Sequence, residues 1–128
     1  MNISAVYDQL ARIATNEFGD LVLQTRLLYL DTGDPLKLRL DIVDQSVLDV
    51  WLSGSGRYSC HWERRHTGQG DLYRYDNAPH KRWRHLSSFP HHFHNGAESA
   101  VIESDLRLPP ELALRRVLTF IRNKLLGK

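Results

Sequence analysis

The spacing of apolar residues predicts a helix near each end of the chain. In residues 3–17 the apolar positions recur at the interval of a helix, and Gly19 follows as a stop signal. These positions are Val6, Leu10, Ile13 and Ala14. Near the other end, Pro109-Pro110-Glu111 suits a helix start, because proline is tolerated in the first turn. The apolar stripe that follows consists of Leu114, Val117, Leu118, Ile121 and Leu125.

The region between these helices shows the two-residue alternation of β-strands. The clearest case is residues 36–42, where Leu and Ile alternate with Lys, Arg and Asp, so one face is buried and one faces water. The predicted strands are residues 21–31, 36–42, 47–52, 57–65 and 72–76, with 97–103 as a sixth candidate. Short connections such as Thr67-Gly68-Gln69-Gly70 separate them, which favours an antiparallel meander.

Residues 77–95 lack both periodicities and are predicted to form a long loop. Loops of this length without regular structure are usually functional or disordered, and the aromatic residues Trp83, Phe89 and Phe93 argue for order. The complete pattern predicts an α+β fold in one domain, residues 1–128. We expect a single antiparallel β-meander of five to six strands, flanked by an N-terminal and a C-terminal helix.

Composition places the chain among ordinary globular proteins, with 128 residues, 41% hydrophobic and 25% charged. No apolar run is long enough for a transmembrane helix, and the N-terminus lacks the pattern of a secretory signal. The single cysteine, Cys60, excludes an internal disulfide and a multi-thiolate zinc site. We therefore expect a cytoplasmic protein that does not bind a membrane.

All seven histidines lie between His61 and His94. Histidine can give and take a proton near neutrality, because its unperturbed pKa is about 6.5. From Arg57 to His94 the chain also carries seven Lys and Arg residues against three Asp and Glu residues, a local charge of +4. This segment is therefore the candidate functional site.

Three interpretations of the histidines remain open on spacing alone. Two imidazoles can exchange protons in phosphodiester cleavage while Arg or Lys stabilises the developing charge, and an RNA substrate supplies its own 2′-hydroxyl. Alternatively, His91-x-x-His94 and His92-x-His94 have spacings at which imidazoles converge on a metal, with His80, His61 or Asp76 as further ligands. In the third interpretation the rings only hydrogen-bond carbonyls and hold the loop in shape.

Three motifs resemble the TumE-like family, whose members are small toxin components of toxin–antitoxin pairs. They are Tyr58-Ser59-x-His61-Trp62, Arg74-x-Asp76-Asn77-Ala78-Pro79-His80 and Phe89-Pro90-His91-His92-x-His94. The resemblance implies a growth-inhibiting toxin, held inactive by a cognate antitoxin that usually carries a helix-turn-helix DNA-binding domain. It also marks the matching residues as functional: His61, Arg74, Asp76, Asn77, His80, His91, His92 and His94.

These observations together predict a metal-independent endoribonuclease toxin without a cofactor. The expected acid–base and orienting residues are His61, His80, His91, His92, His94 and Asp76. The expected RNA-binding residues are Arg74, Asn77, Lys81 and Arg82. The alternatives are a nuclease with a histidine-ligated metal and a non-catalytic module that binds RNA or protein.

Overall fold

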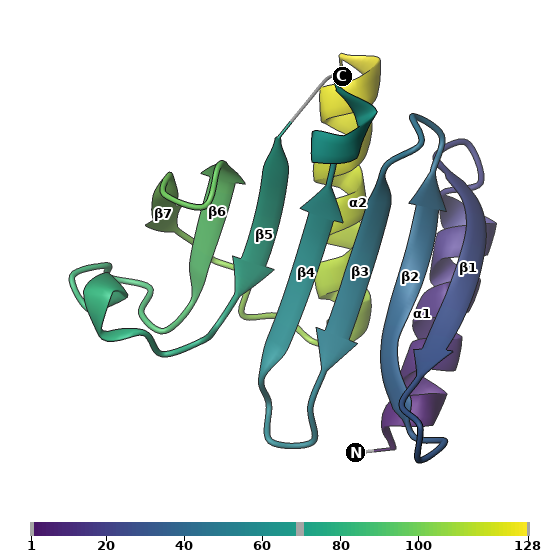
Figure 1. The fold of residues 1–128 in the computed structure, drawn as a ribbon, viewed down its shortest axis with the longest axis horizontal. Helices are drawn as coiled ribbons and strands as arrows, with labels where there is room; N and C mark the ends of the chain where they lie inside the picture. Colours follow the sequence, from purple (N-terminus) through teal and green to yellow (C-terminus); the bar gives the residue numbers. More distant parts are fainter. Residues whose placement is uncertain (1, 69–70, 128) are drawn as a thin grey trace.

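The fold is a seven-stranded antiparallel sheet with two helices, as the computed structural model of residues 2–68 and 71–127 shows (Figure 1). The helices are α1 (Ile3–Glu17) and α2 (Pro110–Leu126). The strands are β1 (Val22–Tyr29), β2 (Pro35–Ile42), β3 (Val47–Leu52), β4 (Tyr58–Glu63), β5 (Leu72–Asp76), β6 (His92–Gly96) and β7 (Val101–Glu103). Each strand pairs with the next along the chain, which confirms the predicted meander and the α+β class.

The predicted number of strands, five to six, is wrong because the segment predicted as one long loop contains β6. In β6 the core-facing residue is Phe93, and its polar neighbours His92 and His94 are also buried. Buried polar residues hide the alternation of apolar and polar positions on which the prediction depends. Only residues 77–91 form an irregular connection, which includes a short 3₁₀ turn, η2 (Lys81–Trp83).

Both helices cover the same face of the sheet and lie behind it in Figure 1. The inward-facing residues of the central strands alternate with polar ones, as in β2, where Leu38, Leu40 and Ile42 are buried. They pack against the apolar stripes of the helices, for example Leu10 of α1 and Leu118 of α2. Burial of apolar area, at about 25 cal/mol per Å², is the main source of stability for such a core.

Local signals set the helix ends. The Asn2 side chain caps α1, because its Oδ1 accepts a hydrogen bond from the Ala5 amide at 3.1 Å. Helix α2 begins with Pro110 and is followed by Gly127, whose φ of 69° is the left-handed conformation that favours glycine. Both helices are therefore confirmed close to their predicted limits.

Neither α1 nor α2 packs against the second face of the sheet, so charged side chains can gather there. Strand pairing aligns Arg39, Asp49, His61, Arg74 and His94 in one row across β2 to β6. Near β2 the charged residues of this row form ion pairs, since Asp49 binds Arg39 at 2.7 Å and Lys37 at 2.8 Å. The other half of the row contains the histidines.

Gln69 and Gly70 of the predicted turn lie outside the described residues; before them the chain forms a 3₁₀ turn, η1 (Arg65–Thr67). In the part of the chain that is described, no helix combines the length and the apolar character needed to cross a membrane.

Candidate functional site

Three adjacent strands bring five polar side chains together on the helix-free face. We call these residues the histidine cluster: His61 of β4, Arg74 and Asp76 of β5, and His92 and His94 of β6. Their positions follow from strand register, because His61 and His94 both pair with Arg74, and His92 pairs with Asp76. Side chains directly opposite in antiparallel strands lie about 5 Å apart, so register alone makes them neighbours.

The intervening residues of these strands point to the helices and fix this orientation. Tyr73, Tyr75 and Phe93 pack their rings around Phe120 of α2, with centroid separations between 5.3 and 6.2 Å. Because successive side chains of a strand alternate, the aromatic packing holds Arg74, Asp76 and both β6 histidines on the opposite face. The cluster is thus positioned by the core.

Asp76, His92 and His94 form the buried part of the cluster, with 6%, 1% and 4% of their surfaces exposed. The Asp76 Oδ1 atom lies 3.1 Å from His92 Nε2 and also accepts a hydrogen bond from the Ala78 amide at 2.9 Å. His92 Nδ1 lies 3.0 Å from the Pro90 carbonyl oxygen, which can only accept, so Nδ1 donates this hydrogen bond. The two contacts of the ring fix its orientation, with Nε2 directed at the Asp76 carboxylate.

Arg74 connects the cluster through all three guanidinium nitrogens. Its Nε donates to Asp76 Oδ2 at 3.0 Å, and its two Nη atoms donate to the Glu98 carboxylate at 2.7 and 3.0 Å. The same Nη atoms lie 3.3 Å from His61 Nδ1 and 3.1 Å from His94 Nε2. The hydrogen bonds that Arg74 donates to Glu98 raise the pKa of Arg74 above its usual value, against the opposing effect of burial.

Arg74 contacts two imidazoles of the cluster. His94 donates from Nδ1 to the Glu98 carbonyl at 2.9 Å, so its Nε2 accepts from Arg74 and the ring is neutral. Burial first, and then the Arg74 charge, lower the pKa of His94, which agrees with a neutral ring. His61 also contacts Arg74, through Nδ1 at 3.3 Å, while its Nε2 lies 3.1 Å from Glu63 Oε1.

An indole covers the cluster from the loop side. The Trp83 ring lies 5.9 Å from the His92 ring and 6.1 Å from the His94 ring, between centroids. The Arg82 guanidinium lies over the Trp83 ring, 5.3 Å from the ring centre. The accessible side of the cluster is therefore the one that His61, Arg74 and Glu98 share, since Glu98 is exposed and the first two are partly so.

The remaining predicted site residues lie elsewhere. His91 precedes His92 and so turns the other way, where its Nδ1 pairs with the Tyr58 hydroxyl at 2.8 Å. Asn77 ties the ends of two strands together by accepting from the Tyr58 amide and donating to the Gly56 carbonyl, both at 3.0 Å. His80, Lys81 and Arg82 are exposed on or beside η2.

Two residues of the site were not predicted. Glu98 lies in the turn between β6 and β7, and nothing in the spacing of an isolated acid marks it as a partner of Arg74. Glu63 could have been found, because it is two residues from His61 on the same face of one strand. Hydrogen bonds from Arg65 and then His61 lower the pKa of Glu63 to about 2, so it is ionised.

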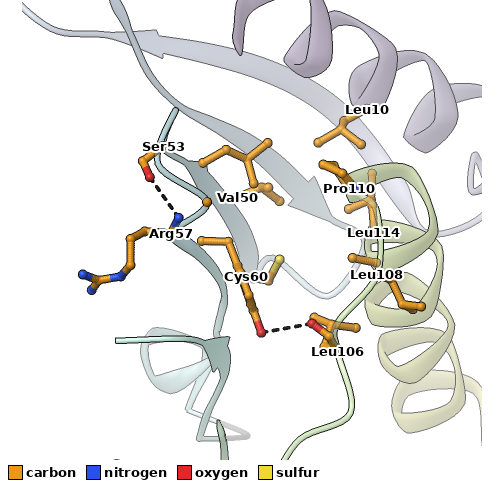
Figure 2. Close-up of a pocket in the computed structure, with 13 residues that line it drawn as sticks. Leu10, Val50, Ser53, Arg57, Cys60, Leu106, Leu108, Pro110 and Leu114 are labelled. Carbon is orange, nitrogen blue, oxygen red and sulfur yellow. Dashed lines mark hydrogen bonds between the residues drawn. The ribbon is translucent and has the colours of Figure 1, made fainter. Parts of the chain in front are cut away.

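A separate cavity of about 210 Å³ lies on the helix side of the sheet, between β3, β4 and the start of α2 (Figure 2). Its lining is mostly apolar, including Val50, Leu108 and Leu114. Burial raises the pKa of the Cys60 thiol to about 12, so the cavity offers no thiolate nucleophile. The predicted site residues that the strands bring together lie on the opposite face of the sheet.

A comparison with protein families supplies the biological role. Residues 11–125 match the family described as Toxin TumE, which is nearly the whole chain. No curated protein and no solved structure matches the chain. Because the match covers the whole sheet, the histidine cluster, the second half of α1 and nearly all of α2, the chain belongs to the TumE toxin family.

Proposed function

We propose that this toxin is an endoribonuclease and that the histidine cluster is its reaction centre. The observation that supports this is the convergence of His61, Arg74 and His94, of which His61 and Arg74 are partly exposed, beside the buried Asp76 and His92. An arginine beside a neutral imidazole combines the two functions that RNA cleavage needs, stabilisation of phosphate charge and proton transfer.

Each member of the cluster has a role in this proposal. The ring of His61, the most accessible histidine of the cluster, would take the proton of the 2′-hydroxyl as this oxygen attacks phosphorus. The imidazolium so formed would return that proton to the leaving 5′-oxygen as its bond to phosphorus breaks, and His94 would hold Arg74 through their 3.1 Å contact. Arg74 would bind the phosphate, and the Glu98 carboxylate on its two Nη atoms already occupies the geometry in which a phosphate binds a guanidinium. Asp76 would position Arg74 and His92.

The exposed loop would hold the RNA strand. Lys81 and Arg82 offer positive charge that can neutralise backbone phosphates, and Trp83 offers a ring next to the cluster. His80 lies beside them and His91 contacts Tyr58, so we assign neither of them a proton-transfer role. Metal independence of this activity remains a prediction.

The test is an assay of the purified toxin with RNA in which two kinds of variant are compared. If the cluster performs chemistry, His94→Gln should abolish cleavage, while Lys81→Glu combined with Arg82→Glu should mainly raise KM. His85→Gln, at an exposed histidine outside the cluster, is the matched control and should cleave normally. A non-catalytic module predicts the opposite: toxicity that survives loss of a cluster histidine but not charge reversal in the loop.

Membership of a toxin family also indicates an antitoxin partner. We propose that this antitoxin carries a helix-turn-helix domain, as in a type II pair, and that it inhibits by covering residues 77–94 with an acidic surface. In hydrogen exchange of the complex, amides of residues 77–94 should then be protected more strongly than those of β1, the opposite edge of the sheet. Unchanged exchange across residues 77–94 would contradict this docking site.

A further inference from the structure

We infer that Asp76, His92 and His94 form a binding site for one divalent transition-metal ion, and that zinc is the ion their atoms fit best. The site lies on β5 and β6, beneath Trp83. It goes beyond the proposed ribonuclease activity, because binding of the ion does not depend on which substrate the toxin uses.

The three candidate ligand atoms are already close enough to share an ion. One atom from each of Asp76, His92 and His94 lies within 4.8 Å of the others. The individual separations from Asp76 are 3.1 Å to His92 Nε2 and 3.7 Å to His94 Nε2. Ligands at about 2.1 Å from a tetrahedral ion are about 3.4 Å apart, so small side-chain movements complete the geometry.

The outer contacts of both rings support this assignment independently. Each histidine donates its Nδ1 proton to a backbone carbonyl, His92 to Pro90 at 3.0 Å and His94 to Glu98 at 2.9 Å. Metal-binding histidines typically donate the second ring nitrogen to a carbonyl or carboxylate, which orients the ring and leaves the other nitrogen for the ion. Here that arrangement occurs twice and directs both Nε2 atoms towards Asp76.

The same hydrogen bonds are compatible with two interpretations of the sequence: histidines that bind a metal, and histidines that hold the backbone in shape. Histidines that hydrogen-bond carbonyls through Nδ1 stabilise the local backbone, and the same bonds prepare Nε2 as a ligand. A metal ion would lie between His92 Nε2 and Asp76 Oδ1, which are 3.1 Å apart.

The local charge is compatible with a cation. Asp76 and Glu98 supply two carboxylates against the single guanidinium of Arg74. The ion must displace Arg74 Nη2 from His94 Nε2, a contact of 3.1 Å. Arg74 keeps a partner after this step, because Glu98 binds both of its Nη atoms on the exposed side.

The donor set distinguishes between ions. Two imidazole nitrogens and one carboxylate suit zinc and related transition metals, whereas magnesium and calcium prefer oxygen ligands. Three protein ligands leave a coordination position open, which is the arrangement of catalytic zinc sites. The open position would face the accessible side of the cluster, where His61 and Arg74 lie.

The experiment is a calorimetric titration of the full chain, without a purification tag, after a chelator has removed bound metal. We expect one zinc ion per chain, and a Tm that is about 10 °C higher at zinc concentrations near 100 times Kd. His94→Gln and His92→Gln should each weaken binding by at least 100-fold, because loss of a ligand exceeds the roughly 10- to 100-fold effect of outer contacts. His66→Gln and His85→Gln are controls at exposed histidines and should bind like the wild type.

A second readout keeps the inference testable if a buried variant fails to fold. Cobalt bound to the wild-type chain should show the visible absorption of a histidine-ligated ion and should quench the fluorescence of Trp83, identified by comparison with Trp83→Phe. Absence of binding, or binding that His94→Gln leaves intact, would overturn the site. Zinc binding without RNA cleavage would support the site and contradict the ribonuclease, so the two proposals fail separately.

Discussion

Replacing Asp76 with asparagine is expected to abolish growth inhibition by this toxin. The variant has nearly the same shape, but each carboxylate oxygen of Asp76 accepts a hydrogen bond, Oδ1 from the Ala78 amide and Oδ2 from Arg74 Nε. In either orientation the amide of asparagine points a donor at another donor. The contacts that orient Arg74 and His92 are then disturbed.

The expected size of the effect is a fall of about 10²–10³ in the rate of RNA cleavage, as for loss of one preorganised electrostatic contact in an active site. Growth inhibition would be measured as colony formation after induction of the toxin. Circular dichroism of the purified variant would confirm that it folds. Asp105→Asn is the matched control, since this exposed carboxylate has an ion pair with Arg116 on α2. A folded Asp76→Asn protein that inhibits growth like the wild type would refute the proposed role of the cluster.

The second large effect is expected at Trp62, where alanine should destabilise the fold by about 4 kcal/mol. The side chain is 1% exposed and stacks on Tyr73 with 5.3 Å between ring centres. Its Nε1 donates to Ser46 Oγ at 2.7 Å, so alanine also removes the hydrogen bond that the buried Ser46 hydroxyl accepts. Since small domains are stable by only about 5–15 kcal/mol, this loss brings the chain close to unfolding.

Urea denaturation followed by circular dichroism would measure this change, because the signal does not depend on the tryptophan that is removed. Leu23→Ala provides the comparison: Leu23 is 68% exposed and should change the free energy of unfolding by less than about 0.5 kcal/mol. Similar small losses in both variants would show that the aromatic packing around α2 does not stabilise the sheet.

Local patterns in the sequence were sufficient for much of the fold. The alternation in residues 36–42 correctly placed Leu38 and Leu40 in the core. These predictions succeed because the direction of a side chain along a strand depends only on the two-residue period. The strand count failed at β6, where the site buries histidines in positions that resemble a solvated loop.

The composition of the histidine cluster was only partly predictable. His61 and Arg74 were both predicted as site residues, and the two pair across β4 and β5. Among the later histidines, sequence reasoning could not separate His91 from His92 and His94, since all lie in one short motif. A shift of one residue in the register of β6 would move His92 and His94 to the other face of the sheet. Which histidines join the cluster therefore depends on how β6 pairs with β5.

The sequence by itself determined the two helices, most of the strands, the focused positive charge and the resemblance to a toxin family. Only the tertiary structure decided that His92 and His94 face Asp76, that His91 turns to Tyr58, and that Glu98 closes on Arg74. The physical reason is that side-chain alternation is a local property of the backbone. Contacts across strands depend instead on register, which is fixed by the packing of the whole sheet against α1 and α2.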